Sequence, residues 1–121
     1  TKNVQDIEWK GIDAVIHLAG MAHQMKKIED QIYFDVNLNL TKELANAAKT
    51  ANIKHFIFAS TIKVFGEHHT NVLTEQTACE PQNDPYGESK LQAERYLQSI
   101  ETDTFKVALV RPPLVYGPGV K

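Results

Sequence analysis

The sequence predicts an α/β fold in which three parallel strands alternate with two helices, a three-layer unit that corresponds to half of a doubly wound sheet. Three short and nearly continuous apolar segments are each typical of a strand buried on both faces of a parallel sheet. Two longer segments lie between them and carry apolar residues at helical spacing, as crossover helices do. Because such crossovers are right-handed, we expect all three strands to be parallel.

The first strand is expected at residues 13–20, where a short apolar run ends in Ala-Gly. Residues 28–51 predict the first crossover helix, because apolar side chains recur there every three or four positions. Asn52 follows as a plausible end of that helix.

Residues 54–61 predict the second strand, whose carboxyl end carries the hydroxyl groups of Ser60 and Thr61. Residues 64–85 are polar and show no sustained period, which predicts a long surface loop. Loops of this length usually have a function or are disordered.

The second helix is expected to begin at Pro85, with Asp84 as its N-cap, and to continue to about residue 100. Residues 104–110 predict the third strand. It ends at an Arg-Pro-Pro sequence, because two prolines cannot donate hydrogen bonds to a sheet.

Composition limits the class of function. The chain has 121 residues, of which 42% are hydrophobic, so it fits one domain or part of one. Its net charge of −2 gives no electrostatic case for binding nucleic acid or an anionic membrane. Cys79 is the one cysteine, so an internal disulfide is impossible and a reducing, cytoplasmic setting is expected. No apolar run approaches the ~18 residues that a membrane-spanning helix needs.

Tyr86 and Lys90 are the strongest chemical candidates. Their spacing of four residues places both on one face of the second helix, where an ammonium can stabilise an ionised phenol and make it a usable acid or base. The topology brings Thr61 to the same edge of the sheet, where its hydroxyl can bond a substrate hydroxyl or carbonyl. Alternatives remain open: Thr61 can cap a local turn, and the pair can belong to an ordinary amphipathic helix.

Other polar residues have simpler interpretations. His17 is expected to be a hydrogen-bonded core residue, whereas His23 can either contact a substrate or lie in a loop without a role. The histidine spacing does not predict a metal site, and Ser60 lacks the frame of a hydrolase nucleophile. Asn37 either faces solvent or is buried and ties the backbone of two strands together.

Five motifs, taken in order, resemble the core of the extended short-chain dehydrogenases/reductases. Within that superfamily the chain is most similar to the NAD-dependent nucleotide-sugar epimerase/dehydratase group, especially to UDP-hexose or UDP-N-acetylhexosamine 4-epimerases and 4-ketoreductases of surface-polysaccharide pathways. The resemblance covers nearly the whole chain. The motifs are His17-Leu18-Ala19-Gly20, Asp35-Val36-Asn37, the segment 56–66, Pro85-Tyr86-Gly87-Glu88-Ser89-Lys90 and the segment 111–119.

The resemblance implies a Rossmann-type domain with NAD as cofactor and a nucleotide sugar as substrate. Tyr86 would remove the proton from the sugar 4-hydroxyl while hydride passes to the nicotinamide, assisted by Thr61 and Lys90. The positions implied to contact the cofactor are Leu18, Ala19, Gly20, Asn37, Ser60, Tyr86, Lys90 and Pro113. Those implied to face the sugar are His23, Lys63 and Val64.

The chain also departs from the family pattern. Leu114 stands where many of these enzymes have an asparagine that contacts substrate. The glycine-rich G-x-x-G-x-x-G turn that holds the pyrophosphate, the acidic ribose partner and the C-terminal substrate region are absent from the 121 residues. We therefore expect a partial domain that is inactive alone.

The implied reaction of the parent enzyme is 4-epimerisation of a UDP-hexose or UDP-N-acetylhexosamine through a 4-keto intermediate. A 4-ketoreductase, a dehydratase and a non-catalytic, cofactor-sensing protein of the same fold are the alternatives. Dehydration is disfavoured, because Ile62 and Lys63 do not supply the acidic pair that this reaction would need beside Thr61. Family members commonly form homodimers through the helices that correspond to residues 28–51 and 86–100.

Overall fold

A computed structural model describes residues 3–22, 29–68 and 71–120. Three strands form one sheet in the order β1-β2-β3. They are β1 (Ala14–His17), β2 (His55–Ala59) and β3 (Lys106–Val110). Both neighbouring pairs are parallel, with Ile16 opposite Ile57 and Ile57 opposite Ala108. The predicted α/β fold with a parallel sheet is therefore confirmed, although each strand is shorter than its apolar run.

The first crossover is one helical run with an irregular centre. It consists of α1 (Asp30–Tyr33), the π-helical segment η2 (Phe34–Asn39) and α2 (Leu40–Thr50). A π-helical turn accommodates an extra residue, and such turns often occur at functional sites. The run ends as predicted, because Asn52 adopts a positive φ of 60° that ends a helix.

The second long helix, α3 (Pro85–Ile100), has the predicted bounds. The Asp84 side chain accepts a hydrogen bond of 3.1 Å from the backbone N–H of Tyr86, and Pro85 occupies the first turn. Two short turns complete the described elements: η1 (Val4–Asp6) near the start of the chain and η3 (Ile62–Phe65) directly after β2.

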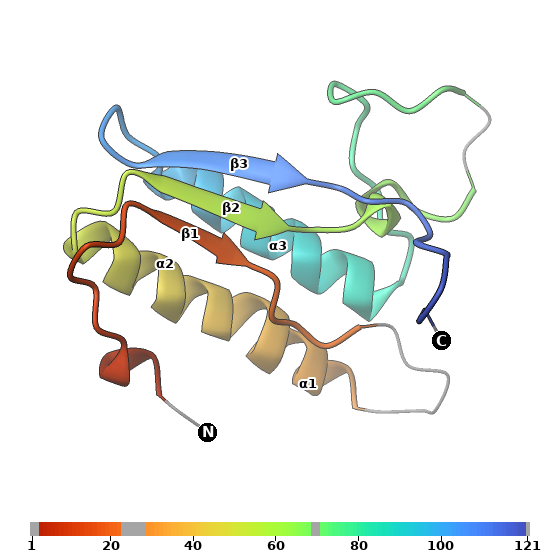
Figure 1. Ribbon diagram of the computed structural model, residues 1–121. Helices are drawn as coiled ribbons and strands as arrows, with labels where there is room; N and C mark the ends of the chain where they lie inside the picture. Colours follow the sequence, from red (N-terminus) through yellow and green to blue (C-terminus); the bar gives the residue numbers. More distant parts are fainter. Residues whose placement is uncertain (1–2, 23–28, 69–70, 121) are drawn as a thin grey trace.

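The two long helices cover the same face of the sheet (Figure 1). Their contact with β2 forms the main core, in which Phe56 and Phe58 are completely buried. A smaller core cluster consists of Val64, Phe65 and Leu91, where η3 packs against α3. This arrangement provides two of the three expected layers.

The opposite face of the sheet is open in the described part of the chain. Ile16 is 66% exposed and Val110 is 49% exposed. The prediction that the strands are buried on both faces is therefore wrong for these residues. The apolar runs of β1 and β3 are as hydrophobic as those of doubly covered strands, but here helices lie on one side only.

Among the described helices, none combines the length and the apolar character that crossing a membrane would require.

Candidate active site

The predicted site residues converge on one edge of the sheet. All three strands end there, and α3 begins at the same edge (Figure 1). Leu18, Ala19 and Gly20 follow β1, whereas Ser60 and Thr61 follow β2. This is the edge at which doubly wound folds bind ligands.

Lys90 is buried on the face of α3 that points to β2. Its Nζ donates a hydrogen bond of 2.6 Å to the carbonyl oxygen of Ala59 and lies 4.4 Å from the centre of the Phe58 ring. Burial lowers the pKa of the ammonium to about 8, and the nearby Glu94 carboxylate only partly opposes this effect. Lys90 is thus a cation that gives up its proton unusually easily.

Tyr86 lies in the first turn of α3, one turn before Lys90. Its ring packs against Tyr33, with ring centres 6.1 Å apart. The pKa of Lys63 is raised, chiefly by a hydrogen bond to Glu67, with smaller contributions from the charges of Asp84 and Tyr86. These interactions place a second ammonium close to the start of α3.

Thr61 and Ser60 provide two buried hydroxyl groups at the end of β2. Thr61 Oγ1 accepts a hydrogen bond of 3.2 Å from the backbone N–H of Lys63 and so caps η3, which is the local role that the sequence left open. A hydroxyl that accepts can still donate its own proton. Within the described chain, Ser60 Oγ has no hydrogen-bond partner although it is buried.

The tight fit between η3 and α3 depends on Gly87. A Cβ atom at this position would lie 2.8 Å from the carbonyl oxygen of Lys63 and 3.1 Å from Asp84 Oδ2. Only glycine lets the Tyr86 turn approach the Thr61 turn this closely.

Asn37 is buried in the π-helical segment, as in the second of the two alternatives. It does not join two strands, however. Its Oδ1 accepts a hydrogen bond of 2.8 Å from the Met21 N–H, and its Nδ2 donates to the Met21 carbonyl and to Ser89 Oγ, each at 3.1 Å. A Cβ atom on Gly20 would lie 2.9 Å from Asn37 Oδ1, so glycine is needed there too.

His17 is a hydrogen-bonded core residue, as predicted. Its Nε2 lies 2.9 Å from Thr41 Oγ1, whose own proton is donated to the carbonyl oxygen of Asn37 at 2.7 Å. His17 therefore donates from Nε2 to Thr41. Burial, together with the charge of Lys90, lowers the pKa of His17 to about 4, so the ring is neutral near pH 7.

The positions expected to face the sugar or the nicotinamide differ in how far they are buried. The Lys63 Nζ pairs with Glu67 at 2.7 Å, and its side chain is 30% exposed. The Val64 side chain is completely buried in the smaller core cluster. Pro113 is exposed beyond β3. His23 lies outside the described residues.

One charged pair near the site was not predicted. Arg111 Nη2 donates to Glu94 Oε2 at 2.6 Å, its Nε donates to both carboxylate oxygens, and its guanidinium lies 4.9 Å from the centre of the Phe65 ring. The Glu94 side chain is 1% exposed and that of Arg111 19%. The two residues are 17 positions apart, in a helix and after a strand, and no sequence pattern indicates that they pair.

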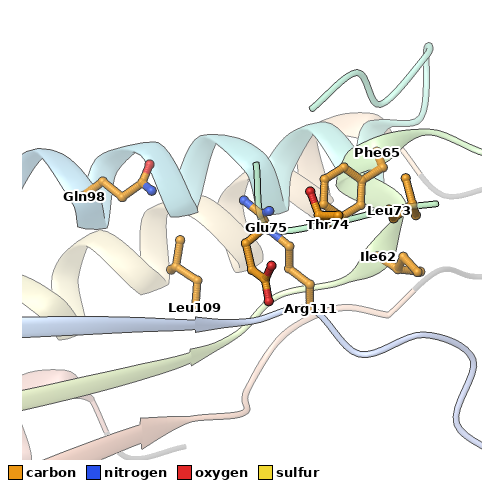
Figure 2. A pocket seen from close by; sticks show the side chains of 8 residues that line it. All are labelled: Ile62, Phe65, Leu73, Thr74, Glu75, Gln98, Leu109 and Arg111. Atoms are coloured by element: carbon orange, nitrogen blue, oxygen red, sulfur yellow. The ribbon is translucent and has the colours of Figure 1, made fainter. Parts of the chain in front are cut away.

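Arg111 also lines an open pocket of about 520 Å³ between α3, the end of β3 and the loop that follows η3 (Figure 2). From α3 the pocket is lined by Gln98, two turns beyond Lys90 along the helix. Among the described residues, no group of three or more His, Cys, Asp or Glu side chains could hold a metal ion.

Known proteins match nearly the whole chain. A family model described as "NAD dependent epimerase/dehydratase family" matches residues 2–121. A UDP-glucose 4-epimerase of Vibrio cholerae is 38% identical over 96% of this chain, and a dTDP-D-glucose 4,6-dehydratase of Mus musculus is 35% identical over 92%. These alignments cover 37% and 32% of the two relatives, so the chain spans about a third of their length.

Solved structures give the same result. The UDP-glucuronic acid 4-epimerase of Bacillus cereus, solved in complex with NAD, superimposes with a TM-score of 0.81 and 28% identity. The superposition covers 97% of this chain and 39% of the other.

Proposed function

The chain belongs to the NAD-dependent epimerase/dehydratase family, and on this premise we propose that it carries the acid–base residues of an enzyme that epimerises a UDP-hexose or UDP-N-acetylhexosamine at C4 through a 4-keto intermediate. The observation that supports this best is the position of Tyr86 and Lys90. They lie on one face of α3, at the edge where β2 ends in Ser60 and Thr61. The chain spans about a third of its relatives, so the activity is proposed for the whole protein.

Tyr86 is proposed to take the proton of the sugar 4-hydroxyl and to return it to the same oxygen once C4 has been reduced from the opposite face. Lys90 supports this transfer, because a desolvated cation close to a phenol favours its ionised form. The Thr61 hydroxyl donates a hydrogen bond to the same sugar oxygen and holds it within reach of Tyr86. One lone pair of its oxygen accepts the Lys63 N–H that caps η3, which restricts the orientation of the hydroxyl.

NAD is the cofactor of the family, and when bound it would supply reversible hydride transfer at C4. The residues that would hold it are those that end β1, together with Ser60, Lys90 and Pro113. Two features fit such a group: Ser60 Oγ is buried without a partner in the described chain, and Leu18, which follows the neighbouring strand β1, is 73% exposed. Gly20 has no side chain, which leaves room for the side chains of Asn37 and Lys90 close to its backbone.

The substrate class is proposed from the relatives together with the residues after Thr61. The similar structures include a Campylobacter jejuni protein described as a UDP-Glc/GlcNAc 4-epimerase. A 4,6-dehydratase reaction is the second candidate, because a dehydratase is also among the relatives. It is less favoured here, since the turn after Thr61 carries Ile62 and the ammonium of Lys63 in place of acids.

The proposal is tested by replacing Tyr86 with Phe in the complete protein and measuring turnover of UDP-glucose. We expect a rate loss of about 10²- to 10⁴-fold, the usual contribution of a general acid–base group, with NAD still bound. Tyr96→Phe on the same helix is the control, because its hydroxyl bonds Asn46 at 2.5 Å away from the site. A Tyr86→Phe enzyme that kept most of its rate would contradict the proposed role.

Two properties of the whole protein are also proposed. Homodimerisation would use the outer surfaces of α2 and α3, which lie side by side and carry the Tyr96–Asn46 bond. A cytoplasmic role in polysaccharide synthesis would follow from the substrate class.

A further inference from the structure

A buried polar junction connects three segments that are far apart in the sequence. Asn37, in η2, binds both backbone groups of Met21, in the segment that follows β1. The same amide donates to Ser89 Oγ on α3 at 3.1 Å. Ser89 in turn donates a hydrogen bond of 2.8 Å to the carbonyl oxygen of Tyr86. The backbone beside Gly20 is thus connected to the backbone of Tyr86 through two side chains.

The bond from Ser89 to Tyr86 would be unremarkable alone, because serines in helices often bond a carbonyl one turn earlier. Ser99 on the same helix does so, donating to Tyr96 at 2.6 Å from an exposed position. Ser89 differs in two respects: it is completely buried, and its oxygen also accepts the Asn37 amide. Its hydroxyl is therefore shared between α3 and η2.

The junction has little freedom to rearrange. Both amide protons of Asn37 are used, one on the Met21 carbonyl and one on Ser89 Oγ. The backbone carbonyl of Asn37 is held by Thr41, which also contacts His17 of β1. The helical run is itself irregular here, since the Leu40 N–H bonds the Asp35 carbonyl five residues back.

We propose that Ser89 is a positioning residue for Tyr86, and that it keeps Tyr86 in register with the Gly20–Met21 backbone. This rests on the proposed function, in which Tyr86 handles the proton and the end of β1 lies along the cofactor. Ser89 itself touches neither. Its hydroxyl fixes the first turn of α3 relative to the segment that follows β1. The distance and orientation between Tyr86 and the bound cofactor would therefore stay constant. Small displacements of reacting groups are costly, about 10²-fold in rate for ~1 Å.

The test compares Ser89→Ala with Ser99→Ala in the complete protein. Both variants remove the same type of bond from the same helix, but only Ser89→Ala also removes the acceptor of Asn37. For Ser89→Ala we expect kcat for UDP-glucose to fall about tenfold, with KM changed less than about twofold, because binding groups stay in place while Tyr86 shifts. Ser99→Ala is expected to leave both constants unchanged.

A second measurement does not depend on activity. Amide hydrogen exchange at Met21 reports whether its bond to Asn37 has loosened, and we expect exchange to accelerate in Ser89→Ala and to stay at the wild-type rate in Ser99→Ala. If Ser89→Ala does not fold, Ser89→Cys, which keeps a weak donor at the same place, is measured instead.

The outcomes separate the two proposals. If the wild-type protein does not turn over a UDP-sugar while Met21 exchange responds to Ser89→Ala, the proposed function fails and the junction stands. If turnover is normal in Ser89→Ala, or if Met21 exchange is unchanged, Ser89 has no positioning role. A rise in KM with unchanged kcat would likewise overturn it, because it would assign Ser89 to substrate binding.

Discussion

At the scale of single residues, burial changes the pKa of two basic side chains. His17 and Lys90 both lie at the sheet edge, and both have a lowered pKa, His17 about 4 and Lys90 about 8. In each case loss of hydration is the largest cause, because it disfavours the charged form. The positive charge of Lys90 also contributes to the lowered pKa of His17, because it disfavours the protonated imidazole.

The lowered pKa of His17 predicts a pH dependence of stability. Its ordinary pKa is 6.5, so between pH 6.5 and about 4 the unfolded chain binds a proton that the folded chain does not. The free energy of unfolding should therefore decrease as pH falls through this interval. Urea unfolding at a series of pH values measures it.

His17→Gln should lose this part of the pH dependence, because the variant has no imidazole to protonate. His55→Gln is the control, since His55 is exposed at the start of β2. A His17→Gln protein whose stability fell between pH 6.5 and 4 as steeply as wild type would contradict the assignment.

Residue roles were predictable only where local sequence decides them. The burial of His17 followed from an apolar run around it, and the capping role of Thr61 from its place after a strand. The burial of Val64 did not follow, because it depends on Leu91 of α3, a distant residue that packs against it. Neighbours from other segments likewise decide that the Ser60 hydroxyl is buried without a hydrogen-bond partner in the described chain.

At the scale of elements, α3 was predicted best because its signals are local. An Asp N-cap and a Pro in the first turn fix its start, whatever the rest of the chain does. The π-helical segment in the first crossover had no such signal, since its apolar spacing resembles that of an ordinary helix. The buried ion pair that joins α3 to the residue after β3, Glu94 with Arg111, was also not predicted.

The Glu94–Arg111 pair predicts a large effect on stability. Arg111→Met leaves the Glu94 carboxylate buried without its partner, and we expect a loss of about 3–5 kcal/mol in the free energy of unfolding. Glu94→Leu combined with Arg111→Met removes both charges, and much of the loss should be recovered. Chemical denaturation of the three proteins measures this.

Lys106→Met is the matched control for the charge change. Lys106 pairs with Asp103 at 3.6 Å, and both side chains are exposed, so the variant should unfold like the wild type. If Arg111→Met were as stable as this control, the buried pair would not attach α3 to β3.

At the scale of the whole molecule, the sheet is covered on one face and open on the other. The exposed apolar side chains there include Ile16 and Leu18 of the β1 segment. The relatives are about three times as long as the stretch they share with this chain.

The isolated chain is predicted to bind NAD too weakly to be stabilised by it. The sequence has no glycine-rich turn to hold the pyrophosphate, and stabilisation grows only as the ligand concentration exceeds the dissociation constant. At about 1 mM NAD we expect the melting temperature to rise by less than about 1 °C. A shift of several degrees in a thermal melt of the 121-residue chain would show that these residues suffice for the cofactor.

The sequence by itself determined the order of strands and helices, the start of α3 and the spacing of Tyr86 and Lys90. These depend on periodicity and capping, which act over a few residues. Only the tertiary structure decided which face of the sheet is covered, that Lys90 donates a hydrogen bond to the Ala59 carbonyl, and that Ser89 and Asn37 join α3 to the end of β1. The physical reason is that burial and hydrogen-bond partners come from segments distant in the chain, so no local pattern contains them.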